Sequence, residues 1–533
     1  MQNSTLKQSV DSPADAQSAY DLAIIGAGIS SAYTLINYIS LLEQQSNPRS
    51  MKIAVVERTG EFWAGVAYGD RTGYNSLLIT SLREFLPQQL EREHFVAWLD
   101  RHRDWIFNLP EHQQGELSRK WLQTHAQELE QGSWDDLFLP RYTFGLYIQQ
   151  QLTNVLDRAI AEGLIELDLL TAEVTDIERS ADIYRLEIDR ANEDPTAFDT
   201  KKVILAIGSP PNGSFDNSQS SLASDGVCDI QDIYVPSIEF NIQRICRSLQ
   251  DSDSNRRQVL IIGSNASTLE IIYGLNNSQV AKNLISKFLI LSPNAAFPSR
   301  ISDRVVEFDY QPQHLVSLVQ SPQSFTAAQI LAAVEQDIAQ AQSDRINIAD
   351  THPQISAMLI KAIDRLSLDE QHKFVDKYSV EIGKLQRRAG GEYLDVVDDL
   401  ITQGKLEFIK GKLIKYRSQA DGGVGCEYLE GENRVPKILT APIGVVINCA
   451  GFQGVKRSSS PLMQNLINSG ICVPNESDRG FLIDENFETS KNFYLMGPLV
   501  AGNINSNLKV WHAESCQRII SFSKHLAAAL IRD

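Results

Sequence analysis

The chain has no CxxC pair, and its six cysteines are scattered along the sequence. Without such a pair the sequence excludes both a dithiol redox centre and a zinc ribbon, and we find no metal-ligand cluster to predict a metal site. We expect most of these cysteines to be small apolar core residues of a protein in the reducing cytoplasm. The six are Cys228, Cys246, Cys426, Cys449, Cys472 and Cys516.

Positive charge is also scarce. The chain carries 49 Lys and Arg against 67 Asp and Glu, a formal net charge of −18. Nucleic acid and anionic membranes bind basic surfaces, so this balance argues against both as partners. No apolar run is long enough to cross a membrane, and the N-terminus lacks the pattern of a signal peptide. Residues 1–20 are polar, and we expect them to be a disordered tail.

A strand, a glycine turn and a helix follow the polar start. Asp21–Ile25 is predicted to be a buried parallel strand, and the small residues Gly26, Gly28 and Ser31 come after it. Gly26 allows the tight turn, Gly28 lets the backbone approach a pyrophosphate, and Ser31 permits close packing of helix on strand. The next strand ends at Glu57, which is placed to accept hydrogen bonds from the ribose of an adenosine. An ordinary strand-to-helix turn does not explain that acid, so we predict a dinucleotide site.

The same pattern recurs in the second half of the chain. Val259–Ile262 is the strand, and Gly263, Asn265 and Thr268 take the three small-residue positions. Asparagine is the residue other than glycine that best tolerates left-handed backbone, so the turn can still form. Its larger side chain would hinder close approach of a pyrophosphate.

The strand that follows this second turn lacks a terminal acid. Lys287–Leu291 ends at Ser292. The missing carboxylate removes the partner expected for NAD and favours the 2′-phosphate of NADP. Arg300 and Arg304 are candidates to meet that phosphate, although a solvated basic loop explains them equally well. Arg141, directly after Pro140, is either a surface charge or an anchor for phosphate or carboxylate.

Several motifs along the chain resemble the two-dinucleotide-binding-domain flavoproteins, in particular the FAD/NAD(P)-binding proteins related to the flavin-dependent N-hydroxylating monooxygenases. The resemblance runs from Asp21 to the last helix. It is carried by Gly26–Gly28, Gly65–Gly69, Phe95–Leu99, Leu139–Arg141, Gly145–Tyr147, Ala206–Gly208, Gly451 and Gly497–Leu499.

This resemblance implies FAD in the first unit and NADPH in the second. It implies FAD contacts for Gly26, Gly28, Glu57 and Gly208, an adenine contact for the Val174 backbone, and a place near the flavin for Gly497 and Pro498. It implies a nicotinamide cofactor at Gly263, Asn265 and Thr268, with the cofactors supplying the redox chemistry. Tyr68, Arg141, Asn505 and His512 are candidates to line the flavin site, each more often a structural residue than a catalytic one.

The expected fold class is α/β, with two Rossmann-like three-layer nucleotide-binding domains and a helical insertion. We assign residues 21–255 and 440–533 to a discontinuous FAD-binding domain. Residues 256–439 form the NAD(P)-binding-like domain, with the insertion at 325–404.

The predicted function is that of an FAD-dependent oxidoreductase in which NAD(P)H reduces the flavin, a monooxygenase acting on a small molecule. A flavin dehydrogenase or oxidase without nicotinamide, or a non-catalytic FAD-binding protein, are the alternatives, because the second turn is poor in glycine. The substrate and the oligomeric state do not follow from the sequence.

Overall fold

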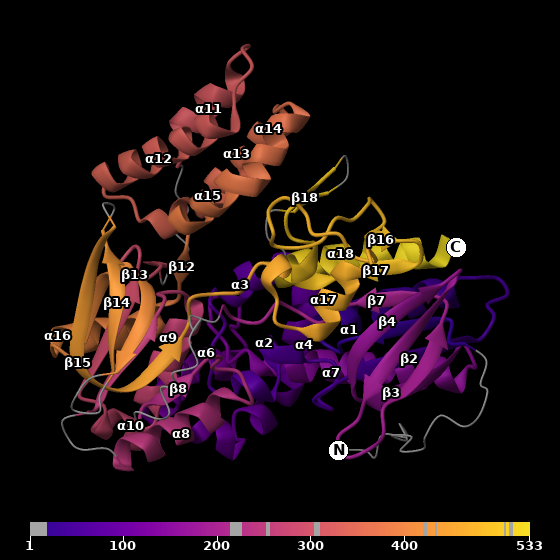
Figure 1. Ribbon diagram of the computed structural model, residues 1–533, viewed down its shortest axis with the longest axis horizontal. Coiled ribbons are helices and arrows are strands. Elements are labelled where there is room, and N and C mark those ends of the chain that lie inside the picture. The colour runs from indigo at the N-terminus through magenta and orange to yellow at the C-terminus, as the bar shows by residue number, and fades with distance from the viewer. Residues whose placement is uncertain are drawn as a thin grey trace.

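The computed structural model describes residues 19–213, 226–251, 256–302, 310–418, 424–431, 434–505, 508–510 and 515–532. Two six-stranded sheets dominate these residues, one on each side of the molecule (Figure 1). The expected α/β architecture of two Rossmann-type units is confirmed. No helix within the described ranges is long and apolar enough to span a membrane.

The first sheet is parallel except at one edge. Its strand order is β16-β17-β7-β1-β2-β3, and only β16 runs antiparallel to its neighbour. Strand β1 is buried throughout because it pairs with β2 on one side and β7 on the other. In sequence order the strands are β1 Leu22–Ile25, β2 Met51–Glu57, β3 Ile165–Thr171, β7 Val203–Leu205, β16 Glu488–Ser490 and β17 Phe493–Leu495.

Helices cover this sheet, and a small antiparallel sheet extends the unit. Helix α1 (Ile29–Glu43) packs against the C-terminal helix α18 (Cys516–Arg532) and against α7 (Tyr142–Ala161). The extension is made of β4 Glu173–Ser180, β5 Ile183–Asp189 and β6 Thr196–Thr200. The other helices of this unit are α2 Gly65–Tyr68, α3 Leu82–Phe85, α4 Gln89–Ile106, α5 Glu116–Thr124, α6 Ala126–Gln131 and α17 Pro461–Asn468.

The second sheet has the order β14-β13-β10-β9-β15-β8. Five strands are parallel, while β14 runs antiparallel to both β13 and β15. The strands are β8 Cys228–Ile230, β9 Gln258–Ile262, β10 Lys287–Ser292, β13 Leu406–Ser418, β14 Val424–Glu430 and β15 Val435–Asn448. The helices of this unit are α8 Ile238–Asp251, α9 Ala266–Asn277, α10 Gln279–Leu284 and α16 Gly391–Thr402.

Strand pairing places three segments differently from the boundaries expected from the sequence. Residues 440–448 belong to β15 and lie in the second sheet, not in the first unit. Strand β8 and helix α8, also expected in the first unit, pair with and pack on β15. Helix α16, expected in the insertion, packs on α9. In each case the deciding contact comes from a partner far away in sequence.

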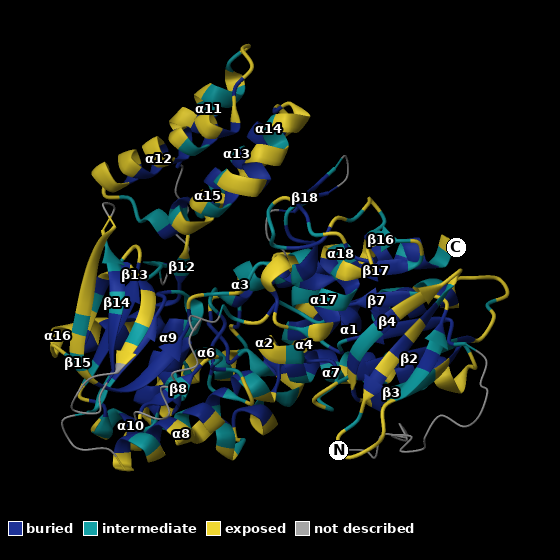
Figure 2. Ribbon diagram, in the orientation of Figure 1, coloured by how far each residue is buried: buried dark blue, intermediate teal, exposed yellow. Residues whose placement is uncertain are grey.

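The remaining helices form a separate layer above the second sheet (Figure 1). Their apolar faces build a core of their own, which also includes Ile504 from the C-terminal part of the chain. The outer faces of these helices are exposed, whereas the central strands β1 and β9 of the two large sheets are almost wholly buried and strands farther out, such as β15, show exposed residues (Figure 2). These helices are α11 Gln313–Gln320, α12 Ala327–Ser343, α13 His352–Asp364, α14 Leu368–Lys373 and α15 Ser379–Leu385.

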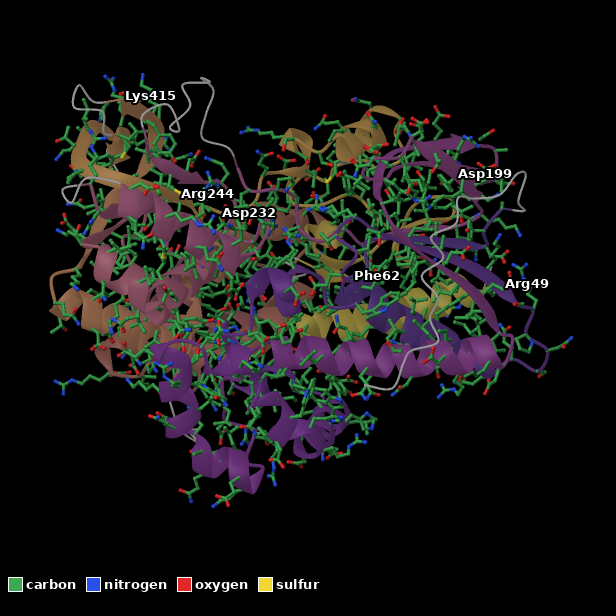
Figure 3. All side chains as sticks on the ribbon, turned by 90° about the horizontal axis from the view of Figure 1, so that it is seen from below. Arg49, Phe62, Asp199, Asp232, Arg244 and Lys415 are labelled. Carbon is green, nitrogen blue, oxygen red and sulfur yellow. The ribbon has the colours of Figure 1, made fainter. Side chains whose placement is uncertain are left out.

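The largest buried cluster runs through both nucleotide units. It contains strand residues of the first sheet and also residues of β9 and α9 from the second, such as Ile261 and Ile272. Each fully buried aliphatic side chain contributes about 1.5–3 kcal/mol, so this shared core holds the two units together. All six cysteines are buried and free, as the sequence predicted for most of them. Charged side chains such as Arg49, Asp199 and Lys415 lie toward the outside (Figure 3).

Candidate functional site

The first glycine turn connects β1 to α1 and leaves no room for a side chain at its first position. Gly26 has a φ of +90°, and a Cβ built there would lie 2.6 Å from the carbonyl oxygen of Ala206, directly after the neighbouring strand β7. Ser31, at the third small position, donates a hydrogen bond of 2.5 Å to the carbonyl of Gly26. The turn is therefore closed by one hydroxyl and by the end of strand β7.

The second turn, between β9 and α9, is built in the same way. Gly263 has a φ of +108°, and a Cβ there would lie 2.2 Å from the carbonyl oxygen of Cys449, directly after β15. Thr268 donates to the carbonyl of Gly263 at 3.0 Å. Asn265 has φ −99° and ψ −170°, so the left-handed conformation that the sequence interpretation allowed for it is not used. This extended backbone is close to that of Gly28, with φ −83° and ψ −172°.

The carboxylate of Glu57 lies directly beside the first turn. Its Oε2 accepts the Ala27 amide at 3.0 Å, and its Oε1 accepts the Thr59 amide at 3.0 Å. A carboxylate held at the end of β2 next to the glycine backbone is in the position in which the ribose contact was predicted. That contact itself stays a prediction.

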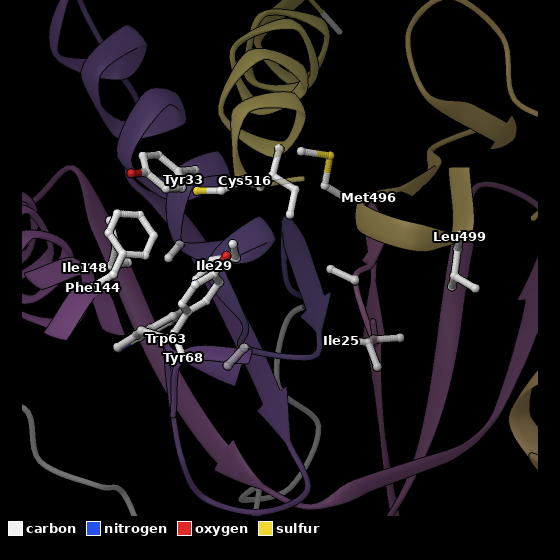
Figure 4. Packing of buried hydrophobic residues seen from close by; sticks show 14 of the residues in the cluster. Ile25, Ile29, Tyr33, Trp63, Tyr68, Phe144, Ile148, Met496, Leu499 and Cys516 are labelled. Carbon is white, nitrogen blue, oxygen red and sulfur yellow. The ribbon is translucent and has the colours of Figure 1, made fainter. Parts of the chain in front are cut away.

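A short segment after β2 crosses the first turn. Trp63, with a φ of 81°, donates its amide to the Ala27 carbonyl at 2.5 Å. A Cβ at Gly65 would lie 2.9 Å from the Cα of Gly28, so the two glycine backbones are in contact. A positive φ is unusual for a bulky residue, and such strain persists where the surroundings impose it. Trp63 lies among the buried side chains around Ile29 in Figure 4.

The strand ends next to the first turn provide a cradle. Gly208 follows β7 with a φ of +80°, and no heavy atom of the described residues lies within 4 Å of a Cβ built there. Gly497, followed by Pro498 at the start of a short helical turn, has a φ of +82° and lies near Ser30 of α1. The first amides of α1 have no intrahelical acceptor and suit an anion. These residues therefore fit an FAD. Val174, for which an adenine contact was predicted, is buried in the adjoining strand β4.

Three carboxylates lie near the first turn, those of Glu57, Glu61 and Asp70. Glu61 accepts the Asp70 amide at 2.6 Å, and burial, together with the nearby Asp70 and Glu57 charges, raises the pKa of Glu61 to about 7. Within the described part of the chain, no group of three or more His, Cys, Asp or Glu could hold a metal ion.

The side chain of Arg141 is only 14% exposed and lies in an ion pair, which argues against the surface-charge interpretation. Its Nη1 and Nη2 each donate to a different oxygen of Glu270 at 2.8 Å, and the Tyr234 hydroxyl also donates to Glu270 at 2.5 Å. The carboxylate that Arg141 anchors is thus one from helix α9 of the second unit. A guanidinium has five N–H donors and this pair uses two of them, so the place of Arg141 at the flavin site stays a prediction.

The other sequence candidates divide into three groups. Tyr68 packs edge-on against Phe144 in the core (Figure 4), and Asn505 accepts the Leu508 amide in a hairpin turn, so both have structural contacts. Arg300 pairs with Asp395 and Asp398 at 2.7 Å and so has carboxylate partners already. Arg304 and His512 lie outside the described residues.

Three residues of the site were missed from the sequence: Glu270, Trp63 and Arg387. Arg387 hydrogen-bonds through its guanidinium to the side chain of Asn265, at the second turn. Glu270 and Arg387 could not be identified locally, because each contacts a residue more than a hundred positions away in the sequence. Only Trp63 had a local signal, because it precedes Ala64 and Gly65 in a loop of small and aromatic residues.

Comparison with known proteins agrees with this geometry. A family model described as FAD-NAD(P)-binding matches residues 23–210. Over the whole chain, the fold is similar to the reduced form of ornithine hydroxylase from Pseudomonas aeruginosa, with a TM-score of 0.56 at 12% identity over 97% of this chain and 99% of that one. It is also similar to the FAD-bound cadaverine monooxygenase DfoA from Erwinia amylovora, with a TM-score of 0.52 at 10% identity over 97% and 95%.

Relatives identified by sequence match almost the whole length of the chain. Uncharacterized proteins from Mycobacterium tuberculosis and Mycobacterium bovis are 30% identical over 517 residues, which is 96% of this chain and 95% of theirs. The chain belongs to the same family as these mycobacterial proteins, and its residues 23–210 match the FAD-NAD(P)-binding family model.

Proposed function

We propose that the protein is an FAD-dependent oxidoreductase that uses NAD(P)H to reduce its flavin and acts as a monooxygenase on a small molecule. The observation that carries the proposal is the presence of two glycine turns of matching geometry, each on its own parallel sheet. Gly26, Gly28, Ser31 and Glu57 would hold FAD. When bound, the two cofactors supply hydride transfer and oxygen chemistry, which requires no catalytic triad or metal from the protein.

The junction between the two sheets supports communication between the two turns. The segments that leave β7 and β15 are hydrogen-bonded to each other: Gly213 donates to the Gly451 carbonyl at 3.1 Å, and Gln453 donates to the Pro211 carbonyl at 2.9 Å. Ligands of open parallel sheets bind beyond the carboxyl ends of the strands. The two carboxyl ends therefore adjoin at this crossing, as hydride transfer between two cofactors would require.

The helices α11–α15 would contribute to the exclusion of water from the site. Lys509, in the hairpin that precedes α18, forms an ion pair with Asp364 of α13, and Arg479 donates to the Val375 carbonyl. The Lys509 contact connects the helical layer to the segment leading into α18, next to which the resemblance places the flavin, and the Arg479 contact connects it to the loop between α17 and β16. A covered site protects a reduced flavin from solvent.

Anaerobic reduction tests the proposal. We expect the purified protein to be yellow and to lose its visible flavin absorbance when NADPH or NADH is added without oxygen. A protein that stays yellow would favour a dehydrogenase or oxidase without nicotinamide, and a protein that binds no FAD would exclude all of these functions. Amines are the first substrates to test, since the fold neighbours are named for ornithine and cadaverine.

A further inference from the structure

Helix α9 is attached to the first unit near both of its ends. It starts at the second glycine turn and ends at Asn277. Near its start, Glu270 forms the ion pair with Arg141, and at its end the side chain of Asn277 reaches helix α5. Because α9 also packs on α8, α10 and α16 of its own unit, contacts that hold α9 hold the second glycine turn with it.

Asn277 caps a helix of the other unit. Its Oδ1 accepts the amides of Leu117 and Ser118 at 2.9 and 3.1 Å. Its Nδ2 donates to the Gln114 carbonyl at 3.1 Å and to the Ser118 hydroxyl at 3.0 Å. The residue before α5 is Gly115, and a Cβ built there would lie 2.2 Å from the Asn277 Oδ1. The first amides of a helix have no intrahelical acceptor, so Asn277, only 6% exposed, supplies one in the space that the glycine leaves.

Both attachments end on helices of the first unit that pack together. Trp121 of α5 stacks on Phe107, directly after α4, with the ring centroids 5.9 Å apart. Helix α4 packs on α7, and Arg141 directly precedes α7. Helix α16, the neighbour of α9, is attached as well, because the Tyr393 hydroxyl accepts the Leu77 amide at 2.7 Å. The second unit therefore contacts one packed body of the first unit at several separate points.

The two contacts on α9 are far enough apart to fix its direction. Glu270 and Asn277 lie about two turns apart on one face of α9, a separation of about 10 Å along the helix axis. A single contact would let α9 pivot about it. Two separated contacts also fix the direction in which the helix, and the glycine turn at its start, point.

We propose that Glu270 and Asn277 are positioning residues that hold the second glycine turn in one orientation against the FAD-binding unit, so that hydride transfer needs no rotation of one unit on the other. The inference rests on the proposed function, because it takes the two turns to hold flavin and nicotinamide. In that transfer a hydride carries two electrons from the reduced nicotinamide to the oxidised flavin, and solvent supplies the second proton. A misplacement of about 1 Å can lower a rate by about 100-fold, so the orientation of the second turn sets the rate.

Pulsed electron paramagnetic resonance on the full-length protein measures the orientation. Glu178→Cys and Lys412→Cys place one spin label at an exposed position of each unit, while the six native cysteines are buried. We expect a single narrow distance distribution that stays in place when FAD and NADP⁺ are added. Adding Asn277→Ala should broaden it, because α9 can then pivot about the Glu270 contact.

Stopped-flow reduction by NADPH without oxygen measures the consequence for the reaction. We expect the limiting rate of flavin reduction to fall about 10- to 100-fold in Asn277→Ala, with FAD content and the Kd of NADP⁺ within about threefold of wild type. A variant that is only less stable would lose bound FAD and keep its rate per bound flavin. Asn276→Ala is the matched control, because the buried Asn276 donates to the Ile272 carbonyl of α9 itself at 2.8 Å. Both measurements should give wild-type values for it.

A broad wild-type distribution, or one that shifts when the cofactors bind, contradicts the inference whatever reaction the protein catalyses. Wild-type distances or a wild-type limiting rate in Asn277→Ala, or an equal loss in Asn276→Ala, also contradict it, while the proposed function stands. If neither NADPH nor NADH reduces the wild-type flavin, the proposed function is wrong and the role in hydride transfer with it, and the spin-label distances still decide whether the units are held in one orientation.

Discussion

The two glycine turns have the same backbone construction and different surroundings. In each, the first glycine has a positive φ and lies against the carbonyl of a neighbouring strand end, and a hydroxyl five residues later closes the turn. At the second position, however, Gly28 touches the backbone of Gly65, whereas Asn265 touches the side chain of Arg387. The strand after the first turn ends in Glu57, and the strand after the second ends in Ser292.

This difference separates what the fold requires from what the ligand requires. The positions that both turns share, the first glycine and the hydroxyl, pack against or hydrogen-bond to the protein's own backbone. We expect the positions that differ to face the place where a dinucleotide would lie. A turn can therefore keep its fold while the second position and the strand end change the ligand that it accepts.

Substituting the shared glycines should have the largest effect. Gly26→Ala and Gly263→Ala each combine a strained φ with a clash against a backbone carbonyl, so we expect a loss of about 2–6 kcal/mol in the free energy of unfolding. Urea unfolding measures this loss, and FAD content measures the ligand. Gly26→Ala should lose FAD, whereas Gly263→Ala should keep FAD and lose nicotinamide binding.

Gly163→Ala is the matched control for these variants. Gly163 also has a positive φ, +71°, but nothing lies within 4 Å of a built Cβ. We therefore expect Gly163→Ala to lose only about 1–2 kcal/mol in the free energy of unfolding, which is what a side chain costs at a positive φ. Equal losses in all three variants would mean that the neighbouring carbonyls do not matter for the turns.

Glu270→Gln tests the contact that joins the second turn's helix to the first unit. Glu270 is buried and pairs with Arg141, whose side chain is only 14% exposed, so neutralising Glu270 leaves an uncompensated charge and should cost about 3–5 kcal/mol in urea unfolding. The double variant Arg141→Met/Glu270→Gln removes that charge and keeps an oxygen for the Tyr234 hydroxyl. We expect it to regain most of the lost stability, and a double variant as unstable as the single one would contradict the ion-pair argument.

How much of the structure can be predicted from the sequence depends on how far apart in the sequence the interacting residues are. The turns at Gly26 and Gly263, the hydroxyls at Ser31 and Thr268, and the acid at Glu57 follow from local spacing, and the structure has these residues in the expected elements. The physical reason is that a strand, a turn and a helix contiguous in sequence are defined by short-range geometry.

Long-range pairing could not be predicted in the same way. The apolar end of β15 fits either sheet, and only its pairing with β9 assigns it to the second. Arg141 and Glu270 are 129 positions apart, and Arg387 and Asn265 are 122 apart. Nothing local to an arginine shows whether its partner is a phosphate, a carboxylate or solvent, so the role of Arg141 stayed open and that of Arg387 was missed.

Glu61→Gln tests the carboxylates near the first turn. The pKa of Glu61 is raised from 4.5 to about 7 in the folded protein, chiefly by burial. A raised carboxyl pKa penalises the folded state as pH rises from about 4.5 to 7, and the penalty is complete above that range. The variant should thus be about 1–3 kcal/mol more stable than wild type at a pH of about 8, with little difference at about 4.5.

Urea unfolding at the two pH values measures this difference. The exposed Glu178→Gln serves as the control for the loss of a carboxylate without burial. If Glu61→Gln shows the same gain at both pH values, the effect is not the ionisation of Glu61.

Substitutions at the second position of each turn should change stability least, because neither backbone needs glycine there. Gly28 has a negative φ, and a Cβ would meet only the Gly65 Cα at an ordinary 3.6 Å, while Asn265 makes no capping hydrogen bond to α9. We expect Gly28→Ala and Asn265→Ala to change the free energy of unfolding of the ligand-free protein by less than about 1 kcal/mol. Ligand titrations should separate them nevertheless: Gly28→Ala should weaken FAD, since its methyl group stands where the pyrophosphate approaches, and leave NADP⁺ unchanged. Wild-type FAD affinity in Gly28→Ala would mean that the pyrophosphate lies elsewhere and that the likeness of the two turns ends at their backbones.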